Sequence, residues 1–169
     1  NIRLDNAVKI GEYLVAKGLA DCNPAKEPIT KNEVKEIHES HKAELYESES
    51  DALLVPKWLG ELQWIAQTTH PTLATGASIY SSLGKQVVPA LLGALKRMFR
   101  YLQGAKRRCL IKEAGVNAGL TVSSDADWAG LYKINGEVRS RSGSIAEYGS
   151  MPVAWKSSFQ QCKGTNYKE

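Results

Sequence analysis

The positions of apolar and polar residues divide the chain into two parts. Over the first two thirds, apolar residues recur at the i, i+3, i+4 spacing of amphipathic helices, whereas short extended runs follow Gly115. Four helices are predicted: one capped by Asp5, one with Pro56 in its first turn, one over 72–83 and one after Pro89. Residues that commonly end helices follow each of them, namely Gly18, His70-Pro71, Gly84 and Gly104.

The apolar faces of these helices are expected to pack into a small bundle. In the first helix the apolar residues are Val8, Ile10, Leu14, Val15 and Leu19. In the last helix the residues expected to face inward are Leu91, Leu92, Leu95, Met98, Phe99 and Leu102, which leaves Lys96, Arg97 and Arg100 outward and exposed. Trp58 and Trp64 are expected in or near the core.

An acidic stretch separates the first helix from the others. Thr30–Ser50 has few large apolar residues and is predicted to be a mobile linker or an exposed loop, within a linker of about 24–52. His38 and His41 within it could share one helical turn. No cysteine or third ligand stands nearby in the sequence, so a zinc site is not favoured there.

The last third of the chain predicts three strands, Leu120–Asp125, Ser140–Tyr148 and Val153–Lys156. Asn135-Gly136 is a turn signal between the first two, and residues 149–152 separate the last two. Strands joined in this way predict an antiparallel meander.

These patterns predict an α+β fold with a helical region over 1–112 and a β-rich region over 113–169. The second region is short for a domain of its own, so we expect it to pack on the helices or to continue into further chain. The chain begins with Asn1 rather than Met, which suggests a fragment or a processed product.

Composition is that of an ordinary globular protein, with 43% hydrophobic and 24% charged residues, which excludes collagen-like and wholly disordered chains. No apolar run approaches the roughly 18 residues of a membrane span, and no secretory leader is recognisable. The 3 cysteines are widely spaced, without a C-x-x-C pair. This favours a reducing compartment, and we expect an intracellular protein without membrane partners.

The net charge of +4 conceals an uneven distribution. Basic residues gather without any acid between positions 96 and 108: Lys96, Arg97, Arg100, Lys106, Arg107 and Arg108. Such a cluster indicates a polyanionic partner such as nucleic acid, although a solvated helix face has the same pattern.

Two carboxylates end the first predicted strand. Alternation places Asp125 and Asp127 on the same side of an extended backbone, where they could share a hard cation such as Mg²⁺. Aspartates also favour Asx-turns at strand ends, and the spacing alone favours that simpler interpretation.

The sequence Ser-Asp-Ala-Asp-Trp-Ala-Gly over 124–130 resembles a motif of copia-type (Pseudoviridae) retrotransposon Pol polyproteins, from the reverse transcriptase thumb into ribonuclease H. Further segments resemble motifs of that family in the same order: Asp21-Cys22-Asn23-Pro24, 58–71, 94–104, 139–143 and 153–157. The resemblance therefore extends over nearly the whole chain.

The resemblance implies a thumb-like helical region and the opening strands of a ribonuclease H-like domain. It further implies two-metal hydrolysis of the RNA strand of an RNA–DNA hybrid, with Asp125 as the first acid and Mg²⁺ ligand. Glu169 aligns with the second catalytic acid or lies just before it. The basic cluster would contact the phosphate backbone, and the rest of the Pol polyprotein would be a partner.

The chain also departs from the family. The R-P-D motif is His70-Pro71-Thr72 here, the aromatic residue after Ser-Gly is Ser144, and neither the polymerase motif Y-V-D-D nor the further ribonuclease H acids are in the sequence. The chain alone is therefore expected to be catalytically inactive. The alternative hypothesis is a degenerate or co-opted copy that acts as a structural or protein-interaction module.

Overall fold

The computed structural model describes residues 1–46, 48–84, 87–115, 119–127, 133–134, 137–138 and 140–160. The chain divides into two compact units, Asn1–Ala114 and Gly115–Glu169, which are described one at a time. Helices form most of the first unit and antiparallel strands form the second, so the expected α+β composition is confirmed. No described helix is both long enough and apolar enough to cross a membrane.

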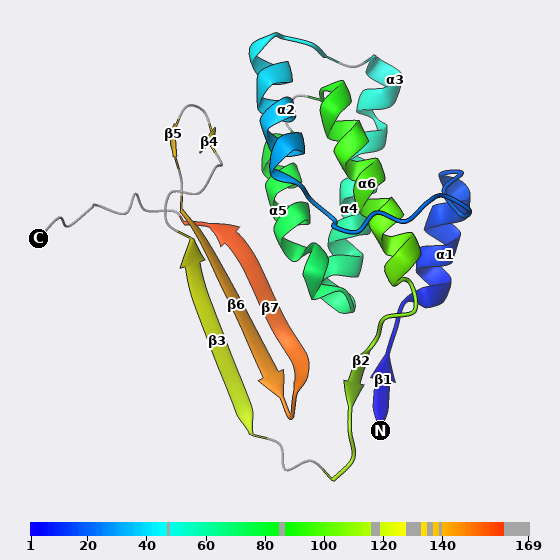
Figure 1. Cartoon of the computed structure of the whole chain (residues 1–169), viewed down its shortest axis with the longest axis vertical. Helices are drawn as coiled ribbons and strands as arrows, with labels where there is room; N and C mark the ends of the chain where they lie inside the picture. Colours follow the sequence, from blue (N-terminus) through cyan, green and yellow to red (C-terminus); the bar gives the residue numbers. More distant parts are fainter. Residues whose placement is uncertain are drawn as a thin grey trace, which may run out of the picture. The chain divides into compact units, whose positions relative to one another are not determined.

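The helices of the first unit follow one another through connections that are mostly short, apart from the longer one between α1 and α2 (Figure 1). They are α1 (Ala7–Ala16), α2 (Lys31–Lys42), α3 (Glu49–Ala52), α4 (Leu54–Thr68), the 3-10 turn η1 (Pro71–Leu73), α5 (Ala74–Leu83) and α6 (Pro89–Ala105). The four predicted helices correspond to α1, α4, α5 and α6. A short antiparallel ribbon that the sequence did not predict joins β1 (Ile2–Leu4) to β2 (Leu110–Lys112).

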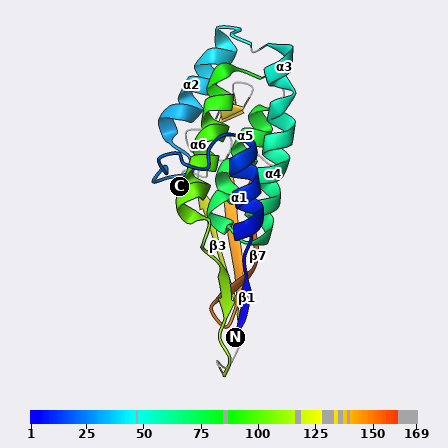
Figure 2. The ribbon, with the colours of Figure 1, turned by 90° about the vertical axis from the view of Figure 1, so that its right-hand side faces the viewer.

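Helix α6 lies in the middle of the helical unit (Figures 1 and 2) and contacts α1, α2, α4 and α5. Its buried residues include all six that the sequence predicted to face inward. Phe99 meets the Trp58 ring of α4 edge-on, with 5.7 Å between ring centroids. Gly104 was expected to end α6, but it lies within the helix, where a Cβ would approach Pro24 Cβ to 3.0 Å. Its lack of a side chain therefore allows close packing.

Helix α1 ends near Gly18, as predicted, but two of the apolar residues predicted to face the bundle are exposed. Gly18, at φ +65°, donates to Val15 O while Leu19 N donates to Leu14 O, a Schellman motif. Ile10 and Leu14 are buried, whereas Val8 and Val15 are 79% and 68% exposed.

Two further sequence predictions in the helical unit need correction. Asn6, not Asp5, is the N-cap residue of α1, although Asp5 accepts a hydrogen bond from the Ala7 amide. Trp58 is buried as expected, but Trp64 is 45% exposed and is not a core residue. Helical spacing gave the apolar positions without deciding which of them have a neighbouring helix.

The prediction of a linker or exposed loop over Thr30–Ser50 is wrong for Lys31–Lys42, which form α2. Thr30 and Glu33 make a reciprocal capping box at its start, and Val34 and Ile37 are buried against the bundle. A narrow apolar stripe and an N-terminal capping box therefore accompany a helix in this otherwise polar segment.

The second unit contains a three-stranded antiparallel sheet of order β3–β6–β7, which confirms the predicted meander. Its strands are β3 (Leu120–Asp127), β6 (Arg141–Tyr148) and β7 (Met151–Phe159). Gly149 and Ser150 both have positive φ and form the two-residue turn between β6 and β7. Strand β7 therefore starts earlier than predicted, at Met151. A short ladder joins β4 (Lys133–Ile134) to β5 (Glu137–Val138); the predicted turn residues Asn135-Gly136 lie outside the described residues.

A caged ammonium group holds α1 against the bundle. The side chain of Lys17 is only 4% exposed and forms an ion pair with Glu61 of α4, which is 13% exposed. The rings of Tyr13, Trp58 and Phe99 also surround its Nζ, with centroids 5.2, 5.5 and 4.3 Å away. The carboxylate and the ring faces together replace the water that the ammonium loses on burial.

We expect Lys17→Met to lower the free energy of unfolding by about 3–5 kcal/mol, because it leaves the Glu61 carboxylate buried without a counter-ion. Urea denaturation followed by circular dichroism measures this loss. Adding Glu61→Gln to that variant should restore part of the stability. The matched control is Lys9→Met, which removes an exposed ion pair with Glu12 and should leave stability unchanged. Equal losses in both lysine variants would contradict the cage.

Candidate functional site

The six basic residues predicted to contact nucleic acid are not equivalent in the structure. Lys96, Arg107 and Arg108 are exposed, while Arg97, Arg100 and Lys106 are partly buried. The expectation that Arg97 and Arg100 are simply exposed is wrong, because both are used within the fold.

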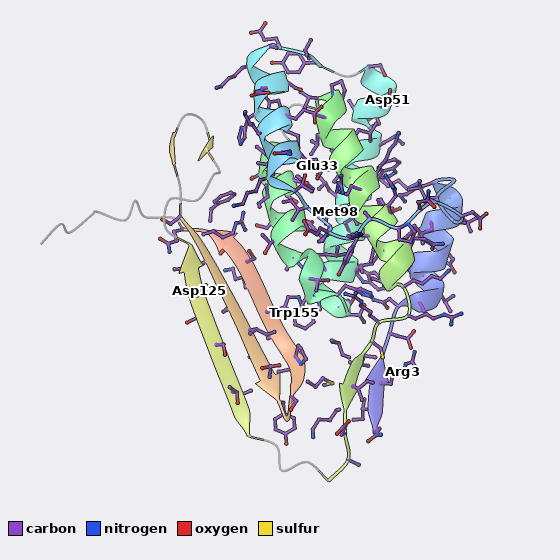
Figure 3. All side chains as sticks on the ribbon, in the orientation of Figure 1. Arg3, Glu33, Asp51, Met98, Asp125 and Trp155 are labelled. Atoms are coloured by element: carbon purple, nitrogen blue, oxygen red, sulfur yellow. The ribbon has the colours of Figure 1, made fainter. Side chains whose placement is uncertain are left out.

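Arg97 and Arg100 fasten other segments to α6. The Arg97 guanidinium forms an ion pair with Glu33 of α2. Glu33, which is labelled in Figure 3, also caps α2 by accepting from the Thr30 amide. Arg100 Nε donates a 2.9 Å hydrogen bond to the Asn23 carbonyl in the connection between α1 and α2. Their positive charges are thus partly occupied by protein acceptors, and they are weaker candidates for phosphate contact than the sequence suggested.

Three consecutive cations, Lys106, Arg107 and Arg108, follow α6 directly and form what we call the basic corner. The chain turns at this point, since Arg108 N donates to Ala105 O. The Arg108 guanidinium donates to Tyr101 Oη at 2.9 Å, which fixes its position while leaving it exposed. Among the described residues, no salt bridge neutralises the basic corner or Lys96. These residues form the candidate nucleic-acid surface.

The buried His70 ring contacts the end of α6, directly before the basic corner. Its Nε2 lies 3.1 Å from the Ala105 carbonyl, which can only accept, so Nε2 carries the proton. Nδ1 then accepts from the Thr69 hydroxyl at 2.8 Å, and Asn6 Nδ2 donates to that same hydroxyl oxygen at 2.9 Å. This chain of hydrogen bonds connects the start of α1, the end of α4 and the end of α6.

The pKa of His70 lies below its usual value. Burial is the main cause, the nearby Arg108 guanidinium lowers the pKa further, and the hydrogen bond to Ala105 opposes both. This role of His70 was not predicted from the sequence. One signal in the sequence could have pointed to it. His70 stands where the R-P-D motif of the retrotransposon family that the sequence resembles has an arginine.

Asp125, the predicted first acid, lies on β3 opposite Gly143 of β6, and its carboxylate is exposed (Figure 3). Its Oδ1 accepts a 2.8 Å hydrogen bond from the Ala126 amide, the next residue of the strand, whereas an Asx-turn would use the amide two residues on. Glu169 and the side chain of Asp127 lie outside the described residues, so the predicted pairing with Asp125 has no structural description.

The described residues do not fit a magnesium centre. Within them, no group of three or more His, Cys, Asp or Glu side chains is arranged to hold a metal ion. Asp125 contributes one carboxylate, and Mg²⁺ requires near-octahedral oxygen coordination. His38 and His41, which lie on α2, belong to no such group among the described residues.

Comparison with known proteins shows relatives of two kinds. It is 32% identical over 103 residues to the secreted RxLR effector protein 161 of Plasmopara viticola, an alignment that covers 61% of this chain and 70% of that protein. The chain belongs to the same family as this effector. No family model matches, and no solved structure matches.

Two retrovirus-related Pol polyproteins of Arabidopsis thaliana, from transposons RE1 and RE2, are also 32% identical over 103 residues. The aligned residues again cover 61% of this chain, but only 7% of either polyprotein. These matches support an origin in a retrotransposon Pol polyprotein.

The His70 network predicts a loss of stability at mildly acidic pH. Because the folded-state pKa is below the unfolded value of about 6.5, unfolding takes up a proton as the pH falls below that value. The contribution of neutral His70 is therefore complete above about pH 6.5 and is lost as the pH falls through the folded-state pKa. Denaturant melts between about pH 7.5 and pH 5 should show this loss in the parent chain and a smaller one in His70→Gln.

His38→Gln is the matched control, because burial and the neighbouring His41 and Lys42 also lower the pKa of His38, but no described hydrogen bond ties its ring to another helix. An unchanged pH dependence in His70→Gln would contradict the assigned network.

We expect Asp125→Asn to leave the melting temperature unchanged within about 1 °C, because the carboxylate is exposed and the amide oxygen can still accept from Ala126. Thermal melts with and without millimolar Mg²⁺ measure both stability and metal binding. A Mg²⁺-dependent stabilisation that disappears in Asp125→Asn would show that the chain already contains an assembled metal site.

Proposed function

We propose that this chain is a copia-type reverse transcriptase thumb followed by the start of a ribonuclease H domain, and that it binds the phosphate backbone of an RNA–DNA hybrid. The observation that carries the proposal is the set of cations at Lys96 and the basic corner, in a chain of Pol origin. Contacts of this kind position a duplex without selecting its sequence. Such a partner would be met inside the cell, in the cytoplasm or nucleus.

The structure supports the basic corner as the principal contact. Tyr101 and the end of α6 hold Arg108 in place, which reduces the side-chain entropy that phosphate binding would otherwise cost. Because Arg97 is paired with Glu33, it contributes mainly to packing of α2. The expected interface is therefore smaller than the cluster of six in the sequence.

Hydrolysis of the RNA strand belongs, in this proposal, to a longer parent protein that includes the rest of the Pol polyprotein. There Asp125 and Glu169 would be two of the acids that hold Mg²⁺. The present chain covers a small fraction of the Pol relatives, and its described residues supply one exposed carboxylate at this position. We therefore propose hybrid binding, and not hydrolysis, as the role of this segment.

A second candidate function is supported by the effector relative. The alignment covers 70% of that protein, so a similar segment makes up most of a short protein there. This favours a co-opted, non-catalytic interaction module as the alternative. Sequencing the transcript that encodes this chain separates the two: an upstream Y-V-D-D motif and a downstream helix with further acids, in one open frame, would exclude the co-opted module.

Hybrid binding predicts a defined salt dependence. Fluorescence anisotropy with a labelled RNA–DNA hybrid gives the slope of log K against log salt, which changes by about 0.9 for each phosphate that the protein no longer neutralises. The double variant Lys96→Gln/Arg107→Gln should lower the magnitude of the slope by about 1.8 and weaken binding at low salt. Both side chains are exposed, so the fold should be unaffected.

The matched control is Lys31→Gln/Lys35→Gln, which removes two exposed charges from α2. It should bind as the parent chain does. Equal effects of the two double variants would show that only net charge matters, and absence of hybrid binding at low salt would exclude the proposed function.

A further inference from the structure

One face of the β3–β6–β7 sheet presents hydroxyl groups around a single ammonium. Strand register places Ser124, Ser144 and Lys156 side by side in one row, with Ser142 and Ser158 in the next row. Because side chains alternate along a strand, these residues share one face, while the Asp125 side chain lies on the other.

An open depression of about 630 Å³ lies at this position, lined by these five residues together with Asp125, Ala126 and Gly143. Gly143 and Ala126 have little or no side chain, which leaves space open within the depression. The depression is therefore formed by small side chains around one long, charged one.

The polar groups of this depression are available to a ligand. Within the described part of the chain, the side chains of Ser124, Ser144, Lys156 and Ser158 make no hydrogen bond or ion pair. The Ser142 hydroxyl accepts from Gln160 Nε2 at 2.9 Å, so its own proton is free to be donated. The depression thus offers several hydroxyl donors and one positive charge in a small area.

We propose that this face binds a phosphate oxyanion, with the Lys156 ammonium supplying the charge and the neighbouring serine hydroxyls donating to the phosphate oxygens. A phosphate has several acceptor oxygens, which matches a set of donors better than a single carboxylate does. The site is built from other residues than the basic corner, and it does not depend on hybrid binding by α6.

Nuclear magnetic resonance titration of the full chain with inorganic phosphate tests the site directly. With chloride at equal ionic strength as the reference, the amides of Ser144 and Ser158 should shift and saturate. In Lys156→Gln the apparent Kd should rise about tenfold, since a hydrogen bond to a charged donor is removed. Shifts that do not saturate, or that persist unchanged in Lys156→Gln, would overturn the proposal.

A second titration, with a single-stranded oligonucleotide lacking terminal phosphates, identifies the source of the phosphate. Shifts at the same amides would identify internal phosphodiesters, whereas shifts with inorganic phosphate alone would identify a free or terminal phosphate; both support the site. Lys35→Gln is the control for removal of one exposed charge. Lys96→Gln/Arg107→Gln should leave the phosphate titration unchanged, so failure of hybrid binding and failure of this site are distinguishable.

Discussion

Burial of α6 is the constraint on which the helical unit depends. Its apolar residues occupy the space between the other helices, and α1, α2, α4 and α5 each contact it. Each fully buried Leu, Met or Phe side chain contributes on the order of 2 kcal/mol of transfer free energy, so this helix supplies much of the stabilising burial. With α6 packed in this way, its charged side chains lie either at the edges of the helix contacts or in solvent.

That geometry explains why neighbouring cations in the sequence have different roles. Arg97 is paired with Glu33 of α2, so it connects two helices. Lys96 and Arg107 point to solvent, where a charge costs little and remains available to a partner. The division follows from where each residue lies on α6, or just after it, relative to the neighbouring helices, rather than from residue type.

The comparisons relate the chain to proteins of two different lengths. One relative is a short protein and two are long polyproteins. The alignment with each of them spans 103 residues. The binding role proposed above would be compatible with either context, because phosphate contacts need only positioned cations. Catalysis needs several carboxylates at one point, and the described residues bring Asp125 there alone.

The sequence by itself determined α4, α5, α6 with its inward residues, the β3–β6–β7 meander and the place of Asp125 on β3, because helical and alternating spacing follow directly from backbone geometry. Only the tertiary structure decided which positions have a neighbour. It made α2 a helix by giving Val34 and Ile37 a surface to cover, and it brought His70 to Ala105, 35 residues further along the chain. Such contacts depend on how distant segments meet, and local spacing does not contain that information.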